Sequence, residues 1–217
     1  MRYYTINGRK FPSVTSILNA TRPQADADRL EQWRQEVGQD EAERLSQQAR
    51  ERGTELHACC ERLLRGQGEP SQVSARTQPF WQSCRPVLAR VSQPQLIEGF
   101  VYHPRQRYAG TLDAYAALDG EPNYLLDFKT ANKPKRADWI HDYFLQTVAY
   151  AAAAYQCHGL SPNGAVILIA LPGDEAQLFK LTRNEMLQLW EIWCQRLEWF
   201  WQKHNPETLE PVAMSAG

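Results

Sequence analysis

Two acidic residues and a lysine interrupt the most apolar part of the chain, the segment 110–129, which reads GTLDAYAALDGEPNYLLDFK. Asp113 stands in the run TLDAYAAL, and Asp127 and Lys129 stand at the end of the run YLLDFKT. The pattern is typical of a β-hairpin. Strand residues two apart share a face, so Asp127 and Lys129 should point one way and Phe128 the other. Such charges are costly to bury unless they pair with each other or bind a cation.

Two interpretations of these charged residues are open. A structural network of ion pairs between strands would explain one acid and one lysine, but it explains poorly why a second acid lies within reach. The other interpretation is a metal site, because Mg²⁺ prefers hard oxygen ligands such as paired carboxylates. Without a cation, two close carboxylates repel each other, and one of them should take up a proton. The metal site is the favoured interpretation.

Further motifs flank this hairpin on both sides. Upstream are RGTELHACCERL, with His57 on a predicted helix, and QLIEGFVYH, with Glu98 on a predicted strand. Downstream, Gln146 and Tyr150 form QTVAY on a predicted helix. With the opening segment YYTINGRKFPSVTSIL, these motifs resemble the PD-(D/E)XK nucleases of the RecB-like branch, in particular the phage-type and mitochondrial genome-maintenance exonucleases. The resemblance runs from about residue 1 to about residue 155.

The resemblance implies a role for each residue of the hairpin. In that family two acids hold a divalent metal, and the lysine helps an attacking water. Carried onto this chain, it implies metal ligands at His57, at Asp113, at Asp127 and at the backbone carbonyl of Phe128. Lys129 would orient and help deprotonate the water, or would stabilise charge on the phosphate. Imidazole beside oxygen ligands also suits Mn²⁺, so the expected cofactor is Mg²⁺ or Mn²⁺.

Four other residues have both a functional and an ordinary interpretation. The resemblance implies that Glu98 contacts the metal or the water, and that Gln146 and Tyr150 approach the lysine and the nucleic-acid backbone. A partly exposed strand glutamate and ordinary helix packing of Tyr150 are the alternatives. Glu61 follows His57 by four residues and shares its helix face. It is either an outer contact of the site or a solvated helix charge.

Two groups of basic residues are candidates for contacts with phosphates, which attract cations without regard to sequence. They are Arg105 and Arg107 in the first hairpin turn, and Lys133, Lys135 and Arg136 after the second acidic strand. Charge runs in loops are usually just solvated, so that alternative stays equally open. Trp139 and Tyr143 are candidate stacking surfaces for unpaired bases, with core packing as the favoured interpretation.

The composition excludes several classes of protein. The 217 residues have a formal net charge of -1, so any nucleic-acid contact must come from a local patch. Five cysteines without a C-x-x-C pair predict buried reduced thiols, and neither a zinc site nor a disulfide framework. The members of this family that hold an iron–sulfur cluster bind it with four cysteines, three of which are grouped near the C-terminus. This chain lacks that group, so no iron–sulfur cluster is expected. With no signal-peptide pattern and no bilayer-length apolar run, we expect a cytoplasmic protein without membrane contact.

The order of predicted elements indicates a single nuclease domain over residues 1–204. Asn-Gly at positions 7 and 8 predicts a hairpin over 1–11. Helices are expected over 13–19, over 25–65 with a break near Gly38, and over 78–91, 137–158 and 183–204; strands are expected over 95–103, 107–118, 123–130, 164–171 and 176–182. This order implies an α/β fold with a central mixed β-sheet flanked by helices on both faces, the restriction-endonuclease-like core. The tail, 205–217, is expected to be disordered.

The predicted function is that of a metal-dependent deoxyribonuclease that leaves a 5′-phosphate and a 3′-hydroxyl, with a place in DNA repair or recombination. By resemblance it is an exonuclease, and its partner is single-stranded DNA. A non-catalytic DNA-binding module of the same fold is one alternative, against which the intact D…D-x-K argues. A restriction-type endonuclease is the other, and it would need recognition elements for which this chain has few residues to spare. Oligomeric state and polarity stay open.

Overall fold

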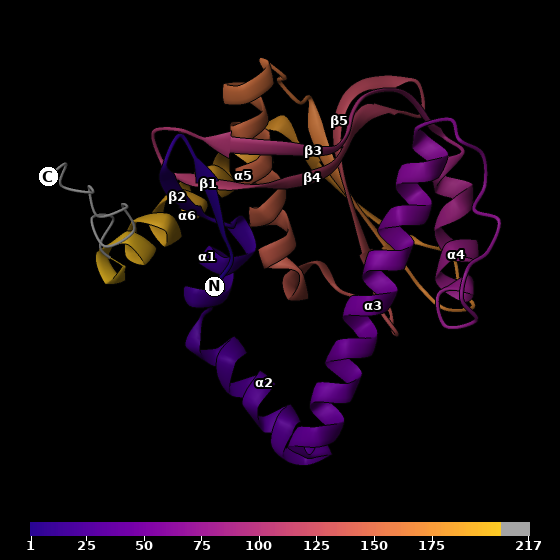
Figure 1. The fold of residues 1–217 in the computed structure, drawn as a ribbon, viewed down its shortest axis with the longest axis horizontal. Coiled ribbons are helices and arrows are strands. Elements are labelled where there is room, and N and C mark those ends of the chain that lie inside the picture. Colours follow the sequence, from indigo (N-terminus) through magenta and orange to yellow (C-terminus); the bar gives the residue numbers. More distant parts are fainter. Residues whose placement is uncertain (205–217) are drawn as a thin grey trace, which may run out of the picture.

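The computed structural model describes residues 1–204, which form a five-stranded mixed sheet with helices on both faces (Figure 1). The strand order is β3-β4-β5-β6-β7. Neighbours are antiparallel except β5 and β6, which are parallel. The strands are β3 (Val91–His103), β4 (Tyr108–Leu118), β5 (Glu121–Thr130), β6 (Gly164–Ala170) and β7 (Gln177–Thr182). The predicted α/β fold is therefore confirmed, whereas the tail expected to be disordered lies outside the described residues.

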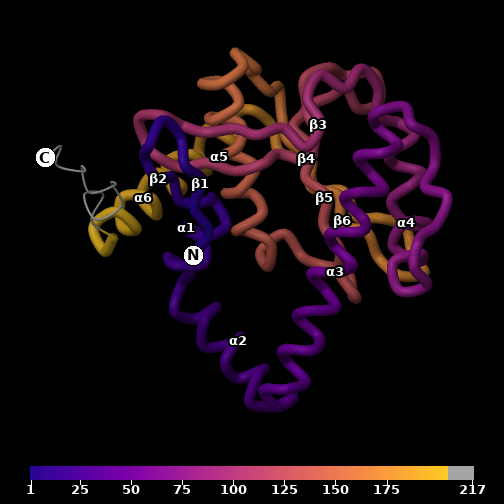
Figure 2. Tube along the Cα trace, in the orientation of Figure 1, coloured from indigo at the N-terminus to yellow at the C-terminus, as the bar shows by residue number. Residues whose placement is uncertain are grey.

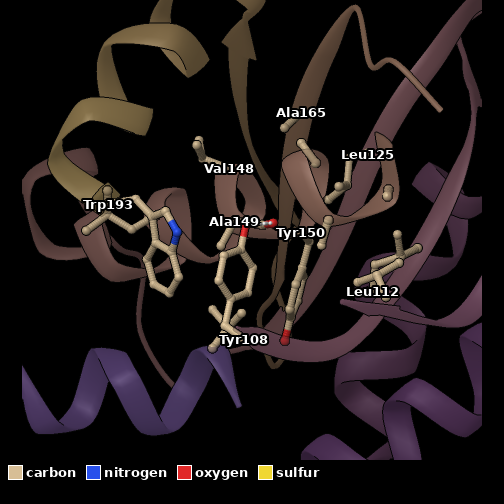
Figure 3. Packing of buried hydrophobic residues seen from close by; sticks show 14 of the residues in the cluster. Tyr108, Leu112, Leu125, Val148, Ala149, Tyr150, Ala165 and Trp193 are labelled. Atoms are coloured by element: carbon tan, nitrogen blue, oxygen red, sulfur yellow. Dashed lines mark hydrogen bonds between the residues drawn. The ribbon is translucent and has the colours of Figure 1, made fainter. Parts of the chain in front are cut away.

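Helices α1 (Val14–Ala20), α5 (His141–His158) and α6 (Arg183–Lys203) cover one face of the sheet. The core of this face is rich in large aromatic side chains. Figure 3 shows Tyr108 of β4 between Trp193 of α6 and Tyr150 of α5, with the Tyr108 hydroxyl donating to the carbonyl oxygen of Ala149 at 3.0 Å. This bond satisfies a buried hydroxyl and ties α5 to the sheet.

Helices α3 (Gln39–Leu64) and α4 (Gln78–Leu88) cover the opposite face. Leu56 of α3 and Trp81 of α4 pack there against Phe128 of β5. In Figure 2, α3 and α4 lie side by side at the edge of the molecule, next to the labels of β5 and β6. Because the central strands are covered on both sides, they are almost continuously apolar, as buried strands are expected to be.

The N-terminal segment forms the predicted hairpin, with strands β1 (Tyr3–Ile6) and β2 (Arg9–Pro12). Asn7 and Gly8 both have positive φ values, 49° and 78°, which is the two-residue turn that Asn-Gly favours. Ser13 follows and caps α1, since its Oγ accepts the backbone N–H of Ser16 at 3.1 Å.

Helices α2 (Gln24–Val37) and α3 form a V that projects from the body of the molecule (Figure 1). The break falls at Gly38, as predicted, and its φ of 84° suits a residue without a Cβ. None of the residues of α2 is buried. The two helices therefore extend beyond the core, and only the later turns of α3 reach the sheet.

Two predicted boundaries are wrong. The helix expected over 78–91 ends at Leu88, and β3 begins at Val91 and not at residue 95. The early part of β3 is irregular: Gln93 has a φ of 49°, and the register against β4 shifts between Ser92 and Leu96. A bulge at this point leaves room for Pro94, which cannot donate a ladder hydrogen bond.

The helix expected over 137–158 is divided. A short 3-10 turn, η1 (Ala137–Trp139), precedes α5, and the two are separated at Ile140. All five cysteines are free thiols; Cys59, Cys60 and Cys84 are buried, as predicted, whereas Cys157 and Cys194 are only partly buried. Among the described helices, none has both the length and the apolar composition that crossing a bilayer would require.

Candidate active site

Asp113 and Asp127 lie next to the point where β4 and β5 separate. The register pairs Ala114 with Leu126, and it continues no further toward Asp113. The side chain of Asp113 bridges the strands there, because its Oδ2 accepts the backbone N–H of Phe128 at 2.6 Å. Beyond this point β5 is held from its other side by its parallel pairing with β6, which runs on to Thr130. Asp113 is therefore positioned by the backbone of the neighbouring strand.

Asp127 and Lys129 point to the same side of β5, as the alternation of strand side chains predicts. Lys129 Nζ lies 2.5 Å from Oδ2 of Asp127, and also 5.2 Å from the ring centre of Tyr143 on α5. Phe128 points the other way, into the core beneath α3 and α4. The ammonium thus lies between a carboxylate and an aromatic face, which favours the charged form of the lysine.

His57 joins α3 to the acidic strands. Its Nε2 lies 2.8 Å from the carbonyl oxygen of Phe128, and its Nδ1 lies 3.4 Å from both Glu98 Oε1 and Asp113 Oδ1. One ligand atom from each of His57, Glu98 and Asp113 lies within 4.8 Å of the others. The structure therefore brings together three of the predicted site residues from α3, β3 and β4, with the Phe128 carbonyl beside them.

The donor set of this cluster fits a small divalent cation. Two neighbouring ligands of an octahedral Mg²⁺, each about 2.1 Å from the ion, lie about 3 Å apart. The 3.4 Å from His57 Nδ1 to each of Glu98 Oε1 and Asp113 Oδ1 is close to this spacing. Imidazole, carboxylate and carbonyl donors suit Mg²⁺ or Mn²⁺. Asp127 is outside the three-residue cluster, and its Oδ2 is in contact with Lys129.

Glu98 adopts an unusual backbone conformation for a strand residue. The register places it opposite Asp113, between the pairs Ile97–Ala114 and Gly99–Leu112. Its φ is 47°, a left-handed value that residues other than glycine seldom adopt. Such strain costs on the order of 1–3 kcal/mol and concentrates at functional sites. The half-buried carboxylate that results is aimed at His57.

The electrostatics of the cluster follow from burial and from its charged neighbours. Burial alone would lower the pKa of His57, but the charges of Asp113 and Glu98 outweigh it and raise the pKa to about 10. Burial opposes ionisation of Asp113, yet His57 and Lys129 hold its pKa below the usual value. Burial raises the pKa of Asp127 to about 6, Lys129 opposes this rise, and Asp113 adds to it. Asp113 is therefore stabilised as a carboxylate, whereas the pKa of Asp127 lies close to neutral pH.

Gln146 and Tyr150 lie on the face of α5 that approaches the acids. Gln146 Nε2 donates to the Tyr150 hydroxyl at 3.4 Å. Burial, followed by the charges of Asp113 and Asp127, raises the pKa of Tyr150. The tyrosine ring lies against Gly110 of β4, where a Cβ would come within 2.5 Å of a ring carbon. Glycine at this position therefore allows the helix and its tyrosine to approach the strand that carries Asp113.

The first basic group lies apart from the acidic cluster. Arg105 and Arg107 are in the turn between β3 and β4, and the guanidinium of Arg107 lies 5.7 Å from the ring centre of Trp201 on α6. Asp113 follows Arg107 by six positions, a distance of about 20 Å along an extended strand. The structure thus does not place these two arginines beside the candidate metal ligands.

The second basic group is closer to the site. Lys133 and Arg136 are exposed in the loop that leaves β5 directly after Thr130, and Lys135 is half-buried there. Arg136 is paired with Asp138 at 3.1 Å, and its guanidinium lies 5.8 Å from the ring centre of Trp139. The favoured core interpretation of Trp139 is wrong, because its side chain is 62% exposed.

Helix α3 carries two further residues of interest, Glu61 and Arg52. Glu61 pairs with Arg65 at 2.8 Å on the helix surface, and it is not part of the metal-ligand cluster. Arg52, by contrast, was not singled out by sequence reasoning, although it begins the RGTELH motif. It is buried and reaches Thr130 on β5. The signal that could have found it is its place at the start of that motif.

Comparison with known proteins gives relatives in sequence, while no family model matches the chain. The chain is 28% identical over 211 residues to mitochondrial genome maintenance exonuclease 1 of Mus musculus, a match that covers 93% of this chain and 62% of that protein. It is 28% identical over 214 residues to the protein of the same name from Xenopus tropicalis, covering 93% of this chain and 60% of the relative. A crystal structure of a proposed exonuclease from Eubacterium rectale aligns with a TM-score of 0.49 and 11% identity, over 76% of this chain and 72% of that one. The chain thus spans about three-fifths of the length of the curated relatives to which it is similar.

Proposed function

We propose that this protein is a metal-dependent deoxyribonuclease of the PD-(D/E)XK type and RecB-like branch, with an exonuclease activity on single-stranded DNA. The observation that carries the proposal is the convergence of His57, Glu98 and Asp113 with the Phe128 carbonyl, next to the Asp127–Lys129 pair. Ordinary structural ion pairs do not require an imidazole, a strained glutamate and two buried acids at one point. A site that binds a cation and a phosphate does require such a set of side chains.

The proposed metal ligands are His57, Asp113 and the Phe128 carbonyl, with Asp127 and Glu98 completing the set. A bound Mg²⁺ or Mn²⁺ would act as a Lewis acid that makes a water more acidic and stabilises charge on the phosphate. Phe128 contributes to the geometry in two ways. Its side chain anchors β5 in the core, and its N–H fixes the Asp113 carboxylate. The carbonyl between them is therefore held in place.

Lys129 is the proposed catalytic base or electrostatic stabiliser. Its ammonium is held by Asp127 and faced by the ring of Tyr143, so its position is set from both sides. Burial would lower the pKa of Lys129, but Asp127 and Asp113 outweigh burial and raise it. The lysine is therefore charged in the protein as it stands, which favours stabilisation of a phosphate over proton abstraction as its first role. Gln146 and Tyr150 would orient groups on the same side.

The curated relatives support the choice of nuclease. Both are named as exonucleases of mitochondrial genome maintenance, and the similarity extends over 93% of this chain. The expected products are 5′-phosphate and 3′-hydroxyl ends, and the expected setting is DNA maintenance, repair or recombination. A cytoplasmic location stays a prediction, since the names of the relatives refer to mitochondria.

Digestion of three single-stranded substrates in one experiment tests this proposal. One strand is labelled at its 5′ end, one at its 3′ end, and one is circular. We expect the linear strands to be degraded in Mg²⁺ or Mn²⁺ and to stay intact in EDTA, and we expect the circle to persist. Cleavage of the circle at a similar rate would instead show an endonuclease. Binding of the linear strands without cleavage in either metal would show a non-catalytic DNA-binding module.

A further inference from the structure

Arg52 is a buried cation for which the protein supplies no anion. It lies on α3 with 9% of its surface exposed. Its Nε donates to Thr130 Oγ1 at 3.2 Å, and its guanidinium carbon lies 4.4 Å from the ring centre of Phe80 on α4. Among the ion pairs and hydrogen bonds of residues 1–204, none joins Arg52 to a carboxylate, and its two Nη groups donate no bond.

The acids closest to Arg52 in sequence are already engaged elsewhere. Glu51 pairs with Arg76 at 3.0 Å. Glu55 accepts the backbone N–H of Ser74 at 2.7 Å and the hydroxyl of Thr77 at 2.5 Å, which fixes the turn that begins α4. Burial and the nearby charge of Arg76 both lower the pKa of the Arg52 guanidinium. The Nη groups of Arg52 are not among the fully buried polar atoms without a partner in the described residues, so they reach solvent, and the arrangement leaves them open to an anion from outside.

The position of Arg52 relates it to the candidate active site. Arg52 precedes His57 by five residues on α3, and Thr130 follows Phe128 by two residues on β5. His57 contacts Phe128, and Arg52 contacts Thr130, so the two contacts follow one another along the same helix and strand. The helix rise and the strand rise both put about 7 Å between them. This is on the order of one to two nucleotide steps along a strand of nucleic acid.

We propose that Arg52 binds a backbone phosphate of the nucleic acid, next to the phosphate at the metal ligands. The inference rests on the proposed function in one respect: the strand bound by Arg52 is the one that the site would cut. Arginine suits this role because its planar fork can bind two phosphate oxygens at once. The Phe80 ring and the Thr130 hydroxyl fix the plane of the guanidinium, so that both Nη groups are left for the phosphate.

The path beyond Arg52 leads toward the second basic group. Thr130 ends β5, and the loop with Lys133, Lys135 and Arg136 begins directly after it. A strand that runs from the His57 contact past Arg52 would therefore continue toward these cations. The buried arginine supplies a fixed contact, and the exposed loop residues supply screened ones.

The salt dependence of DNA binding tests this inference. A labelled single-stranded oligonucleotide is titrated in EDTA, where it stays intact, at several salt concentrations, with the parent protein and with Arg52→Gln, Arg52→Lys and Arg50→Gln. Arg50 is the control, because it is an exposed arginine on the same helix. We expect Arg52→Gln to weaken binding about tenfold or more and to reduce the slope of log K against log salt by about 0.7, the value for one phosphate on a single strand. Arg50→Gln should change neither.

The lysine variant separates a phosphate contact from a structural role. Arg52→Lys keeps the charge and loses the fork, so the slope should return while the affinity recovers only in part. If Arg52→Gln lowers the unfolding temperature but binds DNA with the parent slope, the residue only packs against Phe80 and the inference fails. The same conclusion follows if Arg52→Gln does not fold and Arg52→Lys binds with full parental affinity.

The outcomes also separate this inference from the proposed function. A parent protein that binds the strand through Arg52 but cuts nothing in Mg²⁺ or Mn²⁺ would overturn the nuclease and leave the phosphate contact standing. A parent that cuts, with Arg52→Gln binding as the parent does, would overturn the contact alone. A parent that binds no single strand at any salt concentration would overturn both.

Discussion

The carboxylate of Asp113 accepts the backbone N–H of Phe128 at 2.6 Å and thereby joins β4 to β5 where their ladder stops. Asp127 has no equivalent partner. Both of its oxygens are buried without a hydrogen bond, and its contact with Lys129 at 2.5 Å has ion-pair distance without hydrogen-bond geometry. The two acids of the site therefore differ in what they contribute to folding, although both are proposed metal ligands.

Neutralising each acid in turn should show this difference in metal-free protein. Asp113→Asn should lower the free energy of unfolding by about 2 kcal/mol, because it removes a charge-assisted bond and the pairing with His57. Asp127→Asn should stay within about 1 kcal/mol of the parent or exceed it, because burial raises the pKa of Asp127 to about 6 and its ionisation opposes folding. Urea unfolding in EDTA at pH 7 measures both. Equal losses would contradict this account, and both variants should lose cleavage.

Metal binding should stabilise the protein through the three-residue cluster. A cation at 100 times its dissociation constant raises the free energy of unfolding by about 2.7 kcal/mol when only the folded state binds it. We therefore expect Mg²⁺ or Mn²⁺ to raise the unfolding temperature, EDTA to reverse the rise, and Asp113→Asn to abolish it. Glu61→Gln is the matched control, since Glu61 shares the helix of His57 but pairs with Arg65. A loss of the metal effect in Glu61→Gln would place Glu61 in the outer contacts of the site.

The two basic groups should differ in their contribution to DNA binding. Replacing Lys133, Lys135 and Arg136 with alanine should flatten the salt dependence of binding by about 0.7 for each phosphate that is no longer neutralised. Arg105→Ala should change it little, because the turn that carries Arg105 is separated from Asp113 by about half the length of β4. Titrations of one labelled single strand compare the two variants. The opposite ranking would show that DNA crosses the tip of the β3–β4 hairpin.

The hairpin tip should also make stability depend on pH through His103. This histidine is stacked between Tyr108 and Trp190, and burial, followed by the charge of Arg105, lowers its pKa below the usual value. At His103 the unfolded chain therefore takes up a proton at higher pH than the folded chain, so the contribution of His103 to stability should fall as the pH drops below about 6.5. The raised pKa values of His57 and Asp127 act in the opposite direction, so urea unfolding at pH 7.5 and pH 5.5 is compared between the parent and His103→Phe, which should change more favourably on acidification. The same pH response in both proteins would contradict this role of His103, with His141→Gln, at the exposed start of α5, as control.

The parts of the fold that depend on local pattern could be read from the sequence. Asn7-Gly8 specified its turn, Gly38 specified the break between α2 and α3, and alternation separated Phe128 from Asp127 and Lys129. Each of these depends on neighbouring residues alone. The last residue of α4 and the first residue of β3 could not be predicted in this way, because a bulge set by pairing with β4 decides where β3 begins.

The parts of the site that depend on long-range contacts could not be read in this way. No local pattern shows that Glu98 takes a left-handed conformation opposite Asp113, since Asp113 lies on another strand. Likewise, the sequence does not show that Arg107 lies against Trp201, or that Arg52 reaches Thr130 across 78 positions. The sequence alone does not distinguish one arginine or lysine from another. Only the fold determines which of them is exposed, paired or buried beside the acids.

Lys129 separates an enzyme from a DNA-binding module most sharply. The lysine is no metal ligand, and its ammonium contacts Asp127 and the Tyr143 ring, so Lys129→Ala should leave metal and DNA binding largely intact. The chemical step should slow by about 100-fold or more, which is the scale for a missing general base or electrostatic stabiliser. Single-turnover rates in saturating metal, with a binding isotherm for the same strand, measure the two effects. Lys180→Ala is the control, because Lys180 is an exposed lysine of β7 in the same sheet. An unchanged rate would leave Lys129 as a structural partner of Asp127, and a parallel loss of DNA affinity would make it a phosphate anchor.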